Sequence, residues 1–166
     1  MNTGTANAQE APAQPPGEVA AAGKASELLH RELTGEIIAA FFTVCGELGY
    51  GFVEHVYARA LAIELFVRRI NVSREVPVTV LYKGVTVGNY RADLIVEDKV
   101  VVEVKAGEHA SEADRYQLLN YLRCSGKEVG LLLHFGPKPT ARRVIATRNS
   151  VAVENPEPPP EDTAIQ

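Results

Sequence analysis

The chain has 166 residues, of which 17 are Lys or Arg and 21 are Asp or Glu, and its formal net charge is -4. This balance argues at first against a nucleic-acid ligand, because affinity for phosphates comes mainly from Lys and Arg. The acidic excess lies at the two ends, where residues 1–24 and 154–166 together hold six acidic residues and one basic residue. Residues 25–153 keep 16 basic and 15 acidic residues, a net charge of +1, so a nucleic-acid ligand is not excluded.

The same two ends hold seven of the ten prolines. Segments of this composition bury too little apolar surface to offset the entropy lost on ordering. We therefore predict disordered tails at residues 1–24 and 154–166, and one domain over residues 25–153. No apolar run approaches the roughly 20 residues needed to span a bilayer, and the N-terminus lacks the pattern of a secretion signal. We expect a cytoplasmic protein that does not bind a membrane.

The first half of the domain predicts two helices followed by a hairpin. Apolar residues recur at helical spacing over residues 28–45 and, after a glycine-rich break, over residues 52–70. The pattern then alternates, which predicts strands over residues 76–82 and 85–96 joined by a turn at Lys83-Gly84.

The second half predicts a central strand, a helix and two further strands. Residues 99–106 (KVVVEVKA) are apolar on both sides, as is typical of a strand covered on both faces. A helix over 111–124, a buried strand over 128–135 and a short edge strand over 142–146 follow. The fold class is therefore α/β, with a mixed central sheet flanked by helices.

Charged residues interrupt two of the most apolar segments. Asp93 lies within the run 90–96, and Glu103 and Lys105 lie within the central strand. Burying an unpaired charge costs several kcal/mol, so such residues need a partner, a metal or a catalytic role. Because Glu103 and Lys105 are two residues apart on a strand, they project from the same face.

The loop between these strands decides whether Asp93 joins that face. A three-residue loop at 97–99 pairs residue 96 with residue 100 and places Asp93 opposite Glu103. A two-residue loop at 97–98 would instead put Asp93 on the other face. With the three-residue loop, two carboxylates and the Lys105 ammonium suit a hard cation such as Mg²⁺, or Mn²⁺, that activates water at a phosphate. The alternative is a structural Glu103–Lys105 pair with Asp93 at a strand end.

Asp93, the Glu103-Val-Lys105 segment and residues 117–121 (QLLNY) on the next helix resemble the PD-(D/E)XK nuclease superfamily, including its RecB-like QxxxY branch. Residues 51–57 (GFVEHVY) match the signature of the GxxExxY protein family. The resemblance covers roughly residues 28–147. It implies an αβββαβ restriction-endonuclease-like core and a metal-dependent phosphodiesterase site.

The resemblance also implies roles for individual residues. The metal ligands would be Asp93, Glu103 and Glu54, the last directly or through water, with the Val104 carbonyl as a candidate further ligand. The catalytic set would be Glu54, Asp93, Glu103, Lys105 and Gln117, and Tyr121 would line the cleft beside Gln117. For Glu54 the alternative is a helix cap. Tyr57 lies on the apolar stripe of its helix, which favours packing over chemistry.

Basic residues near the site are candidate phosphate contacts: Arg91, Arg115, Arg142 and Arg143. A solvated basic edge is the alternative for these residues. We expect a Mg²⁺-dependent nuclease that acts on nucleic acid, with DNA preferred to RNA and a homodimer as a candidate assembly. The competing hypothesis is a catalytically silent nucleic-acid-binding or protein-interaction module on the same fold.

Overall fold

The computed structural model describes residues 29–146, and every predicted helix and strand in this range is present. The elements are α2 (Arg31–Leu48), α3 (Glu54–Val67), β1 (Val72–Tyr82), β2 (Val85–Val96), β3 (Val100–Ala106), α4 (Glu112–Ser125), β4 (Val129–Phe135) and β5 (Thr140–Ile145). Both predicted tails, 1–24 and 154–166, and the outer ends of the predicted domain 25–153 lie outside the described residues. None of the helices described is both long and apolar enough to cross a membrane.

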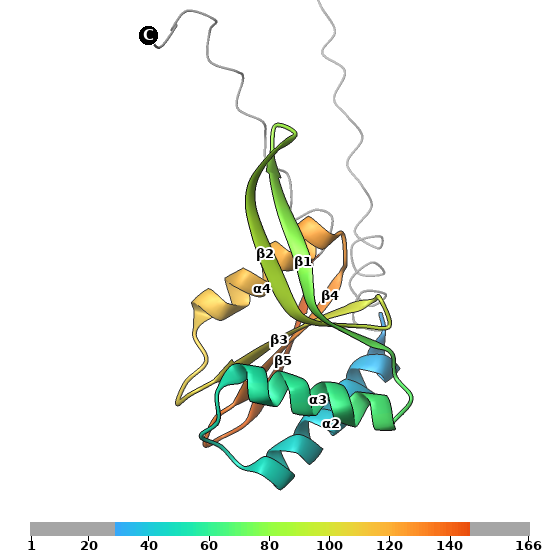
Figure 1. Cartoon of the computed structure of the whole chain (residues 1–166), viewed down its shortest axis with the longest axis vertical. Helices are drawn as coiled ribbons and strands as arrows, with labels where there is room; N and C mark the ends of the chain where they lie inside the picture. The colour runs from blue at the N-terminus through green and yellow to red at the C-terminus, as the bar shows by residue number, and fades with distance from the viewer. Residues whose placement is uncertain (1–28, 147–166) are drawn as a thin grey trace, which may run out of the picture.

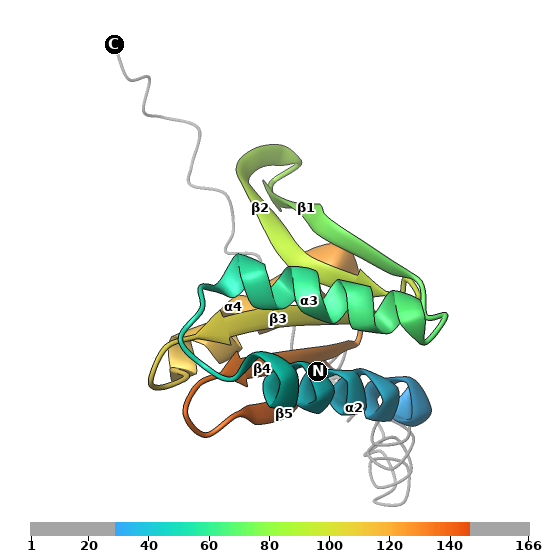
Figure 2. The same ribbon diagram turned by 60° about the horizontal axis from the view of Figure 1, so that its bottom comes forward.

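The five strands form one mixed sheet in the order β1-β2-β3-β4-β5. β3 and β4 are parallel, and the other neighbouring pairs are antiparallel. Figures 1 and 2 show α2 and α3 together on one face of the sheet and α4, the crossover between β3 and β4, on the other. This arrangement confirms the predicted α/β class with a mixed sheet flanked by helices.

β3 runs through the centre of the molecule and contributes to a core on each face. Val102 and Val104 pack in the core under α2 and α3, whereas Val101 packs in the core under α4 with Leu118. Because side chains alternate along a strand, Glu103 and Lys105 share the α4 face with Val101. The prediction of a doubly covered central strand is confirmed.

The loop between β2 and β3 has the three-residue form. Val96 pairs with Val100, and the Lys99 N–H donates to the Val96 carbonyl at 2.9 Å. Glu97 and Asp98 have left-handed φ values of 50° and 53°. The register required for a site at Asp93 and Glu103 is therefore present, and the two-residue alternative is excluded.

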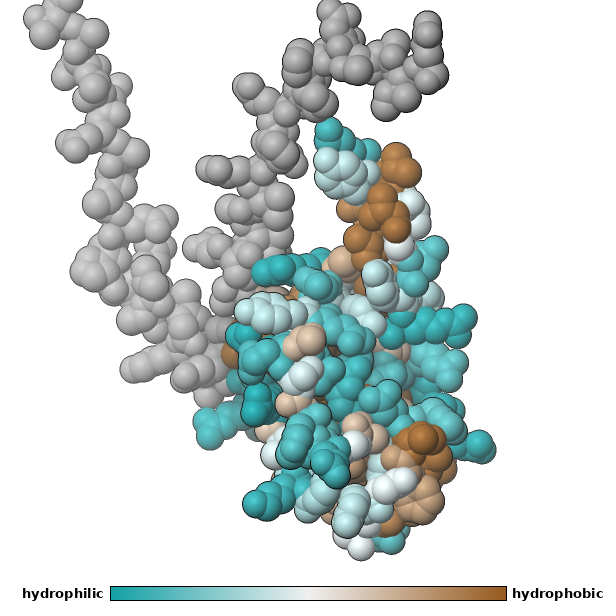
Figure 3. Space-filling model, turned by 90° about the vertical axis from the view of Figure 1, so that its left-hand side faces the viewer, coloured by the Kyte–Doolittle hydropathy of each residue, from teal (hydrophilic) through white to brown (hydrophobic). Residues whose placement is uncertain are grey.

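The hairpin of β1 and β2 projects beyond the body of the domain as an arm (Figures 1 and 2). We call residues 76–92 the β1–β2 arm. β2 pairs with β3 only from Leu94 to Val96, so within the arm β2 pairs with β1 alone. Apolar side chains are exposed along the arm, including those of Leu81 and Val85, and Figure 3 shows them on the projecting hairpin.

The residues of the GxxExxY-like segment fix the connection between α2 and α3. Tyr57 is fully buried; its hydroxyl donates to the Gly49 carbonyl at 2.9 Å and accepts from the Phe52 N–H at 3.2 Å. Gly51 has a φ of 111°, which favours glycine. Tyr57 thus packs and anchors the loop, as expected, and the loop delivers Glu54 as the first residue of α3.

Close contact between β4 and α4 predicts a specific cost for an added methyl group. A Cβ at Gly130 would lie 2.8 Å from Leu118 Cδ1. We expect Gly130→Ala to lower the free energy of unfolding by about 1–3 kcal/mol, as measured by urea denaturation. Gly35→Ala is the matched control, because this helical glycine has no atom within 4 Å of an added Cβ, and it should stabilise the protein by about 0.5–1 kcal/mol. Equal stability of the two variants would contradict the packing argument.

Candidate metal and active site

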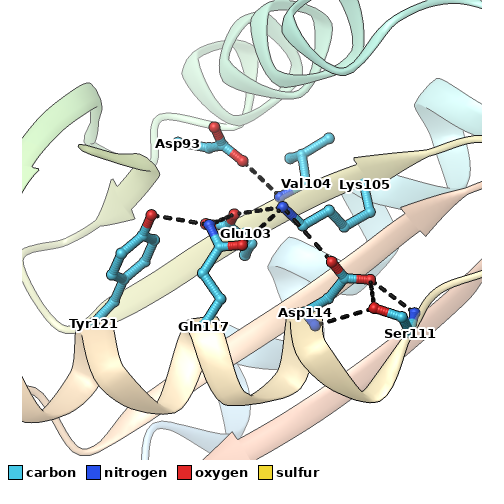
Figure 4. Close-up of polar contacts among 8 residues, drawn as sticks. All are labelled: Asp93, Glu103, Val104, Lys105, Ser111, Asp114, Gln117 and Tyr121. Carbon is cyan, nitrogen blue, oxygen red and sulfur yellow. Dashed lines mark hydrogen bonds and ion pairs between the residues drawn. The ribbon is translucent and has the colours of Figure 1, made fainter. Parts of the chain in front are cut away.

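β2 separates from β3 just where Asp93 lies. The β2–β3 ladder ends at the pair Leu94–Val102, one pair before Asp93 and Glu103 would stand opposite each other. Asp93 Oδ2 instead accepts a hydrogen bond from the Val104 N–H at 2.8 Å. The side chain of Asp93 therefore supplies the acceptor that a neighbouring strand carbonyl would otherwise provide, and this bond fixes the carboxylate beside β3 (Figure 4).

The strand also changes face at Asp93. Leu94 belongs to the core under α2 and α3, whereas Ala92 packs in the core under α4. In a regular strand, residues two apart would share a face. Glu75, at the same level on β1, has a left-handed φ of 51°, so the irregularity involves both strands of the hairpin. Asp93 thus sits at the bend where the β1–β2 arm leaves the sheet.

Glu103 is a buried carboxylate on the α4 face of β3, with only 2% of its surface exposed. Its Oε1 accepts from Lys105 Nζ at 2.9 Å and from Gln117 Nε2 at 2.6 Å. Within residues 29–146, no hydrogen-bond partner reaches its buried Oε2. Burial, reinforced by the negative charge of Asp93, raises the pKa of Glu103 to about 7. One oxygen of this side chain is therefore held by hydrogen bonds, and none of the residues that the structure describes binds the other.

Gln117 and Tyr121 reach the site from one face of α4, since residues four apart on a helix are neighbours. Gln117 Nε2 donates to the Tyr121 hydroxyl at 2.9 Å as well as to Glu103, and Gln117 Oε1 accepts from Lys105 Nζ at 3.2 Å. A single amide thus links the hydroxyl of Tyr121 to both charged residues of β3 (Figure 4). The structure brings together Asp93, Glu103, Lys105, Gln117 and Tyr121.

Asp114 is a further residue of this cluster, and the sequence analysis did not select it. Its Oδ1 lies 3.9 Å from Lys105 Nζ. Its Oδ2 accepts from the Ser111 N–H at 2.7 Å and from Ser111 Oγ at 2.9 Å, which completes a capping box at the start of α4. Two signals were present in the sequence: the S-x-x-D spacing of a capping box and a position one turn before Gln117.

The environment of Lys105 keeps its side chain charged. Burial alone would lower the pKa of this ammonium group. The hydrogen bond and charge of Glu103, with the charges of Glu54 and Asp114, outweigh burial and raise the pKa. Lys105 is therefore a fixed positive charge beside the two carboxylates.

Glu54 lies close enough to the site for its charge to act on Asp93, Glu103 and Lys105. It is exposed at the start of α3, and its charge raises the pKa values of Asp93 and Glu103, in both cases after the larger effect of burial. In the described part of the chain, no three His, Cys, Asp or Glu side chains form a ready metal cage. The predicted Glu54 ligand would thus need water or a side-chain movement to reach a metal held by Asp93 and Glu103.

The donor set fits Mg²⁺ or Mn²⁺. After the larger effect of burial, the charge of Asp93 raises the pKa of Glu103, and within residues 29–146 one buried oxygen of Glu103 has no hydrogen-bond partner. Mg²⁺ usually binds through one or two carboxylates and keeps several waters, so an all-protein cage is not required. Asp93 and Glu103, with the nearby Val104 carbonyl, are the residues that would hold the ion.

Two of the predicted basic contacts gather near the start of α4. Arg115 and Arg142 both lie against Glu112, at 3.9 Å and 3.5 Å. This pair is on the α4 face of the sheet, the face of Glu103.

The other two predicted basic contacts do not join this pair. Arg91, on the β1–β2 arm, lies 3.5 Å from Glu75, whose charge contributes to the raised pKa of Asp93. Arg143 donates a hydrogen bond to the Leu29 carbonyl, just before α2, and therefore lies on the sheet face opposite Glu103. The structure does not bring Arg143 to the cluster, because neighbouring residues of a strand point to opposite faces.

Comparison with known families agrees with this geometry. Residues 31–144 match the model of the PD-(D/E)XK nuclease superfamily. The chain belongs to this superfamily. Superfamily membership and the mixed α/β fold confirm the resemblance seen in the sequence and the restriction-endonuclease-like core. The narrower GxxExxY assignment stays a prediction.

Other comparisons add little to the superfamily assignment. No curated protein matches the chain. A solved structure titled "Crystal structure of SSO0001" is similar at 22% identity with a TM-score of 0.43, over 55% of this chain and 47% of that one. The chain thus spans about half the length of that protein.

The raised pKa of Glu103 predicts a stability profile for the metal-free protein. A carboxyl group whose pKa rises from 4.5 to about 7 on folding binds its proton more tightly in the folded state. The contribution of this group to the free energy of unfolding is therefore largest below pH 4.5 and is lost as the pH rises through 7. Urea unfolding in EDTA between pH 5 and 8 should show this decline. The decline in stability with pH should be shallower in Glu103→Gln, which has no carboxyl group at this position to titrate. The decline should be the same as in the wild type in Glu108→Gln, the control at an exposed position. A pH profile for Glu103→Gln identical to that of the wild type would contradict the assignment.

Proposed function

We propose that the protein is a Mg²⁺- or Mn²⁺-dependent nuclease that hydrolyses phosphodiester bonds of nucleic acid. The observation that carries the proposal is the buried Glu103 carboxylate. One of its oxygens accepts hydrogen bonds from Lys105 and Gln117, and the other has no partner in the described part of the chain. Superfamily membership supports the same class of reaction.

The metal-holding part of the proposal assigns Asp93 and Glu103 as protein ligands. When bound, Mg²⁺ or Mn²⁺ supplies a Lewis acid and a water of lowered pKa. The hydrogen bond from the Val104 N–H orients Asp93, and Gln117 orients Glu103. Glu54 carries the charge nearest to these two on α3 and is the candidate for a water-mediated ligand.

The proposed role of Lys105 is to stabilise negative charge that develops on the phosphate, or to orient the attacking water. Its ammonium group contacts Glu103 and Gln117 and lies near Asp114, so its position is fixed before substrate arrives. Preorganised charges of this kind avoid reorganisation during the reaction. Arg115 and Arg142 are proposed phosphate contacts on the same face.

The second candidate function is a nucleic-acid-binding or protein-interaction module without turnover. The intact Asp93, Glu103 and Lys105 set favours the nuclease, because a binding module gains nothing from a carboxylate buried at such cost. The proposal also includes three predictions from the sequence: DNA as the preferred substrate, a homodimeric assembly and a cytoplasmic location.

Cleavage assays test the proposed roles. Asp93→Asn and Lys105→Ala should each lower the rate of DNA cleavage in Mg²⁺ or Mn²⁺ by at least about 100-fold, because the first removes a ligand charge and the second removes the fixed cation. Asp98→Asn and Lys99→Ala, the same chemical changes in the β2–β3 loop, should retain the wild-type rate. Wild-type rates in Asp93→Asn or Lys105→Ala would refute the mechanism, and binding of DNA without cleavage by the wild type would favour the silent module.

Metal binding can be measured without any substrate. Mn²⁺ at ten times its dissociation constant should stabilise the wild-type protein by about 1.4 kcal/mol, seen as a higher melting temperature. Isothermal calorimetry should give one Mn²⁺ site, which Asp93→Asn and Glu103→Gln should each abolish while Asp98→Asn retains it. Equal Mn²⁺ affinity in the wild type and both site variants would place the metal elsewhere.

A further inference from the structure

A groove of about 720 Å³ lies between the β1–β2 arm and α4. The arm contributes Val80, Val87 and Tyr90 to its walls, and α4 contributes Tyr116, Asn120 and Tyr121. We call it the tyrosine groove. Its volume is in the range of pockets that bind small molecules or single nucleotides.

The tyrosine groove is continuous with the candidate metal site. Gln117 and Tyr121 line the groove, and the same Gln117 amide binds Glu103 at 2.6 Å and Tyr121 at 2.9 Å. Figure 4 shows these two side chains rising from α4 towards β3. A nucleotide whose phosphate lies at Asp93 and Glu103 would therefore have the groove beside it.

The aromatic rings in the groove are open to a ligand. Tyr90 and Tyr116 are 53% and 59% exposed, although aromatic side chains gain most from burial. The ring of Tyr90 lies 6.1 Å from that of Tyr121, tilted by 50°. Gly88 makes room for this arrangement, because a Cβ there would lie 3.1 Å from the Tyr90 ring. The rings thus offer apolar faces on both walls of the groove.

The charges at the groove suit a polyanion with flat apolar groups. Arg123 is part of the lining, and the Arg115 guanidinium lies 5.7 Å from the centre of the Tyr116 ring. Arginine beside an aromatic platform is a common means of holding bases and phosphates of a single strand. Asn120 adds both a donor and an acceptor for the edge of a base.

We propose that the tyrosine groove binds an unpaired nucleobase next to the phosphate to be cleaved, so that the substrate is a single strand or the unpaired part of a duplex. The faces of a base within a duplex are covered by its stacked neighbours, and only an unstacked base can present them to Tyr90 and Tyr116. The position relative to the cleaved bond rests on the proposed nuclease function, whereas the binding itself does not.

Binding in EDTA tests the proposal separately from cleavage. The probes are a fluorescein-labelled single-stranded DNA 12-mer, the same strand with abasic sites, and its blunt duplex, each followed by fluorescence anisotropy. Tyr90→Ala and Tyr116→Ala should each weaken single-strand binding by about 5- to 100-fold. Tyr90→Phe and Tyr116→Phe keep the ring and should bind within twofold of the wild type. Tyr82→Ala, an exposed tyrosine outside the groove lining, is the matched control and should also bind normally.

The outcome of the binding assay in EDTA tests the tyrosine groove independently of the metal site. Tighter binding of the single strand than of the duplex, lost with abasic sites or with the alanine variants, supports the proposal even if no cleavage occurs. Wild-type affinity for the single strand in both alanine variants overturns the proposal, whatever the cleavage assay gives. The same holds if the alanine variants weaken binding of the duplex as much as binding of the single strand. Sedimentation that shows a dimer broken by Tyr90→Ala and Tyr116→Ala would assign the groove to a second copy of the chain and would also overturn it.

Discussion

The buried carboxylate of Glu103 is the constraint around which the rest of the site is arranged. An isolated charge at this depth would be expensive, and among residues 29–146 hydrogen bonds reach one of its two oxygens and not the other. Lys105 comes from the same strand and Gln117 from the crossover helix, so the site depends on α4 being packed on β3. The apolar contacts of Val101 and Leu118 beside it hold those two elements together. Stability and chemistry are thus supplied by neighbouring residues of the same two elements.

Much of this was predictable from the sequence because the patterns involved are local. The period of apolar residues predicted the helices and strands. The sequence narrowed the register of β2 against β3 to two alternatives, a two- or a three-residue loop, and the structure has the three-residue loop at 97–99. The spacing of Gln117 and Tyr121 placed both on one helix face, where the structure has them. Asp93 and Glu103 stood out because charge is rare in apolar strands.

The remaining features depend on tertiary packing that no local pattern encodes. The separation of β2 from β3 at Asp93 accompanies the bend of a hairpin whose outer part pairs with no third strand among residues 29–146. Arg143 was grouped with Arg142 by proximity in sequence, but the two point to opposite faces of an edge strand. The S-x-x-D spacing marked Asp114 as part of a helix cap, but its approach to Lys105 arises only from the packing of α4 on β3. The tyrosine groove joins residues of β1, β2 and α4 that meet only in the folded protein.

The hydrogen bond between Asp93 and the Val104 N–H makes one side chain part of both the backbone ladder and the proposed metal site. Folding therefore orders this carboxylate before any ion binds. The entropy lost in fixing the side chain is part of folding and does not lower the affinity for a metal. The same coupling narrows what evolution can place there. The side chain at position 93 has to be short and has to carry an acceptor for the Val104 N–H. Aspartate is the residue that meets both conditions and also carries a negative charge. A change of metal preference at the proposed site would therefore have to come from the other proposed ligands, Glu103 and Glu54, rather than from position 93.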